Sequence, residues 1–142
     1  MRFVDTNVLL YAVSTAPGEA AKGRVARRLL EADDLALSVQ VLQEFYVQAT
    51  RGNRRGSLTH EQAALLIESW LRFPVQETTV ALVQAALETK RRHRLSYWDA
   101  AIIEAARVLE CETLLSEDLA HSRDYDGVRV ANPFRSSASS AS

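Results

Sequence analysis

The sequence predicts an α/β fold, a three-layer sandwich in which a short-stranded, mainly parallel sheet lies between layers of helices. Short apolar runs that resemble strands alternate along the chain with longer segments of helical periodicity. Such an alternation is typical of a parallel sheet covered by helices on both faces. Ligands of these sheets bind beyond the carboxyl ends of the strands, so polar residues that follow a strand are the first candidates for a site.

The predicted strands are residues 3–4, 35–38, 73–75, 113–116 and 128–130. The predicted helices are residues 17–32, 39–50, 59–70, 79–94 and 96–109, and a short helix is also expected directly after the first strand. Ser38 and Ser96 are well placed to cap helices, and Thr59 with Gln62 forms a capping box. The apolar periodicity predicts that these residues face the core: Val25, Val41, Phe45, Val80, Val83, Leu87, Trp98 and Ile102.

Composition is ordinary for a single globular domain. The chain has 142 residues, of which 47% are apolar and 25% charged, with a formal net charge of -1. The overall charge does not favour a polyanionic partner, so any nucleic-acid surface must be a local basic patch. Cys111 lies in an apolar stretch and is expected to pack in the core. There is no apolar run long enough for a signal peptide or a membrane span, and we expect a cytoplasmic protein.

Four acidic residues stand out because of their positions in this framework. Asp5 ends the first strand, Glu44 lies on the helix after the second, Asp99 lies in the first turn of a helix, and Asp118 follows the strand that ends at Ser116. In a parallel sheet all four can converge at one edge, where they would repel each other unless cations bind. Oxygen-rich sites suit Mg²⁺ or Mn²⁺, and one or two such ions would support hydrolysis of a phosphodiester.

Each acid also has a structural interpretation when it is taken alone. Asp99 stands where a capping-box acid would lie, and Glu44 is consistent with a solvated surface position. Asp118 is consistent with a polar loop, and Asn7 with a turn or helix start after Asp5. The combination of the four acids, rather than any one of them, predicts a metal site.

The acidic segments resemble the successive motifs of PIN-domain ribonucleases. The matching segments are Val-Asp-Thr-Asn-Val-Leu (residues 4–9), Gln-Glu-Phe-Tyr (43–46), Ser-Tyr-Trp-Asp-Ala-Ala-Ile (96–102) and Leu-Leu-Ser-Glu-Asp-Leu (114–119). The resemblance covers residues 1–134, which we therefore interpret as one PIN-like nuclease domain. Residues 135–142 are rich in serine and alanine and are expected to be a disordered tail.

The resemblance implies Asp5 and Asp99 as principal metal ligands, with Glu44 and Asp118 completing the acidic site. Thr6, Asn7 and Ser116 would support the ligands or the phosphate. Only Asp118 matches the family position, but the adjacent Glu117 leaves open which of the two acids faces the metal. A chain of this size looks most like the VapC toxins, which cleave RNA, are silenced by an antitoxin and commonly form homodimers.

Two basic segments are candidates for RNA binding. Arg91, Arg92 and Arg94 lie at the end of the helix before the Asp99 motif, and Arg54 and Arg55 lie in a glycine-bearing loop. The first group has an alternative role in stabilising the helix dipole, and the second in solubility. Of the aromatic residues, Tyr97 is the best candidate to contact RNA, since the others have the spacing of core residues.

The predicted function is therefore a metal-dependent endoribonuclease, the toxin of a toxin–antitoxin pair. One alternative is an RNA-processing or RNA-binding protein of the same family outside such a pair. Another is an Asp-based phosphotransfer or phosphatase domain, which also places an aspartate at a strand end. Those sites usually have a second acid two residues later, where this chain has Asn7.

Overall fold

The computed structural model describes residues 1–135, so the tail predicted for residues 135–142 lies outside the described part from Ser136 onward. Six strands in these residues form one sheet with the order β3-β2-β1-β4-β6-β5. Their bounds are Arg2–Val4 (β1), Leu35–Ser38 (β2), Val75–Gln76 (β3), Thr113–Leu115 (β4), Asp124–Tyr125 (β5) and Val128–Ala131 (β6). The α/β prediction is confirmed, and the short antiparallel β5 at one edge was not predicted.

The central strand β1 connects the two halves of the sheet. It pairs in parallel with β2 through Arg2 and Leu35, and in parallel with β4 through Val4 and Leu115. The backbone N–H of Asp5 continues this ladder by donating to the Leu115 carbonyl at 3.0 Å. The carboxyl ends of β1, β2 and β4 therefore lie at the same edge, and the residues that follow them are brought together there.

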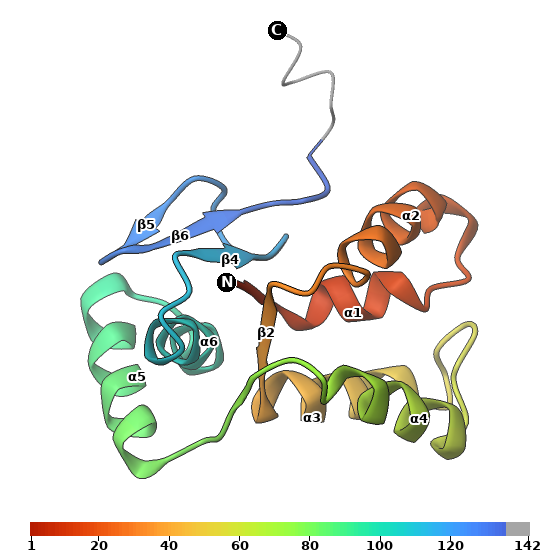
Figure 1. Cartoon of the computed structure of the whole chain (residues 1–142), viewed down its shortest axis with the longest axis horizontal. Helices are drawn as coiled ribbons and strands as arrows, with labels where there is room; N and C mark the ends of the chain where they lie inside the picture. Colours follow the sequence, from red (N-terminus) through yellow and green to blue (C-terminus); the bar gives the residue numbers. More distant parts are fainter. Residues whose placement is uncertain (136–142) are drawn as a thin grey trace, which may run out of the picture.

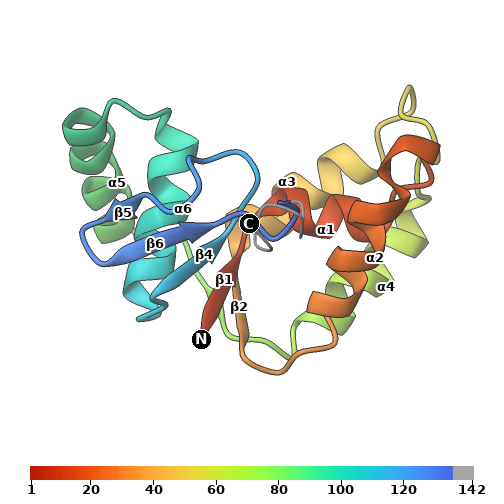
Figure 2. The ribbon, with the colours of Figure 1, turned by 90° about the horizontal axis from the view of Figure 1, so that it is seen from above.

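The helices are Thr6–Ala12 (α1), Ala20–Leu29 (α2), Val39–Ala49 (α3), His60–Trp70 (α4), Val80–His93 (α5) and Tyr97–Val108 (α6), with a 3₁₀ turn at Pro17–Glu19. Figure 2 shows the sheet between the α5–α6 pair and the group α1–α4, and Figure 1 shows the same arrangement from another side. The predicted caps are confirmed, since Ser38, Thr59 and Ser96 each accept a hydrogen bond from a first-turn N–H. None of the helices in residues 1–135 combines the length and apolarity that a bilayer span requires.

The core lies on both faces of the sheet. Phe3, Leu37 and Leu114 are fully buried on the central strands, and Phe45 of α3 packs edge-to-face against Trp70 of α4 with ring centroids 4.8 Å apart. Cys111 is buried, which confirms its predicted role in packing. This core fixes α1, α3 and α6 around the carboxyl edge of the sheet.

Three predicted core positions on α5 and α6 were wrong. Val80, Leu87 and Trp98 are 76%, 54% and 61% exposed. In α5 the buried face is formed by other residues, including Leu82 and Ala86, because the helix packs on α6 along that side. The helical periodicity of apolar residues shows roughly which face of a helix is apolar. It does not show how much of that face the neighbouring helix or sheet covers. The prediction for Val25 fails for the same reason, since α2 buries Gly23 and Ala26 and leaves Val25 38% exposed.

Candidate active site

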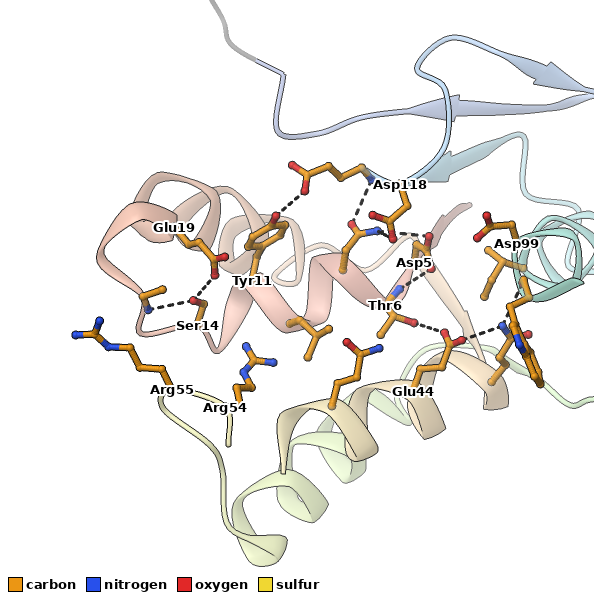
Figure 3. A pocket seen from close by; sticks show the side chains of 18 residues that line it. Asp5, Thr6, Tyr11, Ser14, Glu19, Glu44, Arg54, Arg55, Asp99 and Asp118 are labelled. Carbon is orange, nitrogen blue, oxygen red and sulfur yellow. Dashed lines mark hydrogen bonds between the residues drawn. The ribbon is translucent and has the colours of Figure 1, made fainter. Parts of the chain in front are cut away.

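A cavity of about 520 Å³ opens at the carboxyl edge of the sheet, between α1, α3 and α6 (Figure 3). All four predicted acids line it: Asp5, Glu44, Asp99 and Asp118. They come from the end of β1, from α3, from the first turn of α6 and from the loop after β4. The topology therefore brings together side chains that are up to 113 residues apart, as the sequence pattern predicted.

Asp5 is the most deeply placed of these acids, with 5% of its surface exposed. Its Oδ1 accepts a hydrogen bond from the Thr6 N–H at 2.7 Å, and its Oδ2 accepts one from Ser116 Oγ at 2.7 Å. Burial raises the pKa of Asp5 from 3.8 to about 7, against the lowering effect of these hydrogen bonds, and the charges of Asp118 and Glu44 raise it further. At neutral pH the ionised form of Asp5 is therefore penalised in the metal-free protein.

The adjacent acids Glu117 and Asp118 have opposite surroundings. Glu117 accepts hydrogen bonds from Tyr11 Oη at 2.5 Å and from Lys22 Nζ at 2.6 Å, and the ammonium group and the phenol hold its pKa below the usual range despite burial. Asp118 accepts a hydrogen bond from Asn7 Nδ2 at 3.2 Å, and its charge raises the pKa of Asp5. Lys22 of α2 therefore balances the negative charge of Glu117, whereas the charge of Asp118 adds to that of the other acids in the cavity.

Asn7 organises the loop that carries these two acids. Its Nδ2 also lies 3.3 Å from Ser116 Oγ, and its Oδ1 accepts a hydrogen bond from the Glu117 N–H at 3.3 Å. The Asp118 N–H in turn donates to Ser116 Oγ at 3.1 Å. Asn7 and Ser116 therefore position Asp5 and Asp118 relative to each other, which is the type of supporting contact expected of them.

Glu44 is held at the cavity by two neighbours. Its Oε1 accepts a hydrogen bond from Thr6 Oγ1 at 2.7 Å, and its Oε2 accepts one from Gln40 Nε2 at 3.3 Å. Glu44 is half-buried rather than a freely solvated surface residue. Thr6 thus links the environment of Glu44 to that of Asp5.

Asp99 lies in the first turn of α6, where Ser96 Oγ accepts a hydrogen bond from its N–H at 3.1 Å. Its side chain lines the cavity and is half-buried. Desolvation by burial raises the pKa of Asp99, and the charges of Asp118 and Glu44 raise it further. Asp99 therefore lies in the first turn of a helix and also belongs to the group of acids that line the cavity.

The chemistry of this cluster fits a hard divalent cation. Among residues 1–135, no salt bridge joins Asp5, Glu44, Asp99 or Asp118 to a lysine, arginine or histidine. Carboxylate oxygens with amide and hydroxyl neighbours are the donors that Mg²⁺ and Mn²⁺ prefer. In the described part of the chain no three acidic, histidine or cysteine side chains already stand close enough to enclose an ion. The acidic cluster therefore fits a divalent cation because of its oxygen donors and its unpaired negative charge.

The two predicted basic segments differ in location. Arg54 and Arg55 line the cavity, across from the acids (Figure 3). Arg91, Arg92 and Arg94 are not among the residues that line it. Arg91 pairs with Glu88 at 2.5 Å, and Arg92 pairs with Asp126 of the β5–β6 turn at 3.2 Å.

Sequence reasoning missed three residues that line the cavity and one ion pair beside it. Gln40, Tyr11 and Trp98 line the cavity, whereas the favoured aromatic candidate, Tyr97, does not. Trp98 was assigned to the core because of its helical spacing, although its place directly before Asp99 was a signal for the site. The Lys22–Glu117 pair joins residues 95 positions apart, and nothing in the local sequence indicates it.

A parallel sheet with a carboxylate-lined cavity at its carboxyl edge defines an α/β domain with an acidic site. The chain belongs to the PIN domain family, which it matches over residues 2–127.

Comparison with curated proteins gave no match. The fold is similar to that of a toxin–antitoxin complex from Klebsiella pneumoniae, with a TM-score of 0.68 and 20% identity over 94% of this chain and 98% of that chain. It is also similar to VapC20 of Mycobacterium tuberculosis, described as a sarcin-ricin loop cleaving toxin, with a TM-score of 0.64 and 21% identity over 83% and 92% of the two chains. FitAcB from Neisseria gonorrhoeae gives a TM-score of 0.64 and 17% identity over 96% of this chain and 100% of that chain. At these identities the likeness shows a shared fold.

Proposed function

We propose that this protein is an Mg²⁺- or Mn²⁺-dependent endoribonuclease that acts as the toxin of a toxin–antitoxin pair. One observation carries the proposal: four carboxylates with no cationic partner in residues 1–135 meet in one open cavity, and burial raises the pKa of the deepest, Asp5, to about 7. Such an arrangement is destabilising unless a ligand cation compensates it. The PIN family membership and the toxins among proteins of similar fold support the same function.

The chain's own residues would act in three ways. Asp5, Glu44, Asp99 and Asp118 would hold one or two cations, and Asn7, Thr6 and Ser116 would keep the carboxylates oriented. A divalent cation held by these residues would supply Lewis-acid chemistry, lowering the pKa of a water molecule and offsetting the charge of a phosphodiester. Arg54 and Arg55, on the other side of the cavity, would bind the phosphates of the RNA backbone.

The partner assignment rests on proteins of similar fold. These include toxin–antitoxin complexes, among them VapBC from Salmonella typhimurium bound to DNA. We propose that a cognate antitoxin covers the site of this chain, that the chain acts in the cytoplasm, and that it forms a homodimer. Light scattering of the purified protein, alone and with the product of the adjacent gene, tests the assembly.

A phosphoryl-enzyme mechanism on Asp5 is disfavoured by its surroundings. Both carboxylate oxygens already accept hydrogen bonds, from Thr6 and Ser116, and the side chain is almost fully buried. The residue two positions later is Asn7, whose amide donates to Asp118 rather than supplying an acid. These surroundings favour the proposed role of Asp5 as a cation ligand over that of a nucleophile.

Cleavage of RNA by the purified chain tests the proposal. With Mg²⁺ or Mn²⁺ the chain is expected to cleave RNA, and chelation is expected to stop it. Asp99→Asn is expected to remove the activity, while Asp33→Asn, an exposed acid in the loop before β2, should retain it. Metal-independent binding of RNA without cleavage would instead identify a non-catalytic RNA-binding module.

A further inference from the structure

A second hollow adjoins the acidic cavity along α3 and the start of α6. Its volume is about 350 Å³. It is lined by Gln40, Gln43, Glu44, Val47, Gln48, Arg51 and Trp98. Four of these residues, Gln40, Glu44, Gln48 and Trp98, also line the acidic cavity, so the two spaces are neighbours. A ligand in the hollow would contact Glu44 and Trp98, which also face the acidic cavity.

Trp98 is the main apolar surface of this hollow. Its side chain is 61% exposed, whereas the other tryptophan, Trp70, is 5% exposed against Phe45 in the core. Tyr97 packs edge-to-face on Trp98 with ring centroids 5.1 Å apart. Gln40 Nε2 donates to the Trp98 carbonyl oxygen at 3.2 Å, which ties the first turn of α6 to α3. Tyr97 therefore supports the exposed indole on one side, while Gln40 holds the backbone of the same residue.

The other walls have the chemistry of a nucleobase site. Gln43 and Gln48 are exposed and supply amide groups that both donate and accept hydrogen bonds, as base edges do. Gln40 Nε2 already donates to Glu44 and to the Trp98 carbonyl, so Gln40 offers only its Oε1 as an acceptor. Arg51 brings a positive charge to the rim, next to the loop that carries Arg54 and Arg55. A flat aromatic surface, neutral hydrogen-bonding groups and a cationic rim together match an unstacked base with its phosphate.

We propose that Trp98 and the glutamines of α3 form a subsite for one unstacked base of a single-stranded RNA. The inference rests on the proposed function, and it adds a reason for substrate choice. Trp98 and Asp99 both line the acidic cavity, so a base stacked on Trp98 would have its neighbouring phosphodiester in the cavity that holds the acids. The subsite therefore selects single-stranded segments or loops, since a base inside a duplex cannot reach the indole.

Binding of short RNA to a cleavage-deficient protein tests this inference. In the Asp5→Asn, Trp70→Phe background, Trp98 is the only tryptophan, and single-stranded RNA is expected to quench its fluorescence by stacking. Stacking on an aromatic side chain is typically worth about tenfold in affinity per base. Anisotropy of labelled RNA should therefore show about tenfold weaker binding for Trp98→Ala, with most affinity regained in Trp98→Phe. Leu65→Ala, which removes a 71% exposed side chain on α4 outside the hollow, is the matched control.

An oligonucleotide that lacks one base isolates the stacking contact. Removing a base at the right position should weaken binding to the Trp98 protein but leave binding to Trp98→Ala unchanged. Equal affinity of both proteins for intact RNA, or no RNA binding at all, would overturn the inference. Loss of an oligomer or of antitoxin binding in Trp98→Ala, with RNA affinity unchanged, would also overturn it and identify a protein interface.

Cleavage by the wild-type chain separates this result from the proposed function. If wild type cleaves RNA and Trp98→Ala has the same KM, only the subsite is wrong. If RNA quenches Trp98 but no metal supports cleavage, the subsite stands and the nuclease proposal fails.

Discussion

Two acidic regions of the molecule differ in how their charge is balanced. Where α5, α6 and the β5–β6 turn meet, Glu104 accepts hydrogen bonds from Thr89 at 2.8 Å and from Arg107 at 3.1 Å. In the same region Asp126 pairs with Arg92 and His93, and hydrogen bonding to His93 holds its pKa below the usual value. At the carboxyl edge of the sheet, by contrast, burial raises the pKa of Asp5 and of Asp99.

The difference separates acids that stabilise the fold from acids that lower its stability in the absence of a ligand. A carboxylate with a cationic partner is more easily ionised in the folded than in the unfolded state, so its charge favours folding. A buried carboxylate beside other carboxylates has the opposite effect. The second pattern is typical of sites that bind a cation or carry out proton chemistry. The same contrast distinguishes Glu117, paired with Lys22, from its neighbour Asp118.

The largest expected effect is on cleavage. Asp5→Asn and Asp99→Asn should each lower kcat/KM by about 100-fold or more, because each removes charge that would hold the cation. Asp126→Asn, the matched change in the paired region, should leave kcat/KM within about threefold. Steady-state cleavage of a labelled RNA measures all three. Equal losses in the three variants would show that the two regions do not differ in function.

Removing the basic partner of a paired acid is expected to lower stability and leave cleavage nearly unchanged, the opposite of the effect expected for the cavity acids. Arg107→Met leaves the buried Glu104 without its cation, and the free energy of unfolding should fall by about 3 kcal/mol. Denaturant unfolding measures the loss, while kcat/KM below the unfolding temperature should be nearly unchanged. Full stability in this variant would mean that the paired acids do not stabilise the fold.

The pH dependence of the free energy of unfolding should show directly how much the ionisation of buried Asp5 destabilises the folded state. Between pH 3.8 and about 7, Asp5 is ionised in the unfolded chain but still binds a proton in the folded one. The folded state then binds more protons, so the free energy of unfolding contributed by this group falls as pH rises, by at most roughly 1.4 kcal/mol per pH unit. Without metal, Asp5→Asn should therefore become more stable relative to wild type as pH increases across this window. A constant difference would contradict the raised pKa.

A smaller effect is expected from the basic residues. Arg54→Gln and Arg55→Gln together should raise KM for RNA by about tenfold and reduce its salt dependence, since they remove phosphate contacts at the cavity. Arg91→Gln and Arg92→Gln should change KM little, because their charges are engaged by Glu88 and Asp126. Cleavage at two salt concentrations measures the difference. If the Arg91 and Arg92 substitutions raised KM more than the Arg54 and Arg55 substitutions, the RNA would instead bind on the α5 side of α6.

The sheet and the convergence of the four acids at one edge could be predicted, because the strand ends and helix starts that position them follow from local patterns. A strand end fixes the position of Asp5, and the serine caps fix the starts of α3 and α6. The features that were missed depend on contacts between distant segments. Lys22 pairs with Glu117 from 95 residues away, and Asp126 pairs with Arg92 across 34 residues. The exposure of Trp98 follows from its place in the first turn of α6 beside the cavity, which a helical period does not reveal.

Thermal unfolding at neutral pH with and without Mg²⁺ tests most directly whether the unpaired acids bind a cation. A ligand that binds only the folded state stabilises it by about 2.7 kcal/mol at one hundred times its Kd. Wild type is predicted to gain stability with Mg²⁺ or Mn²⁺, and Asp5→Asn is predicted to gain much less. No gain in wild type, or an equal gain in both proteins, would contradict a cation site at Asp5.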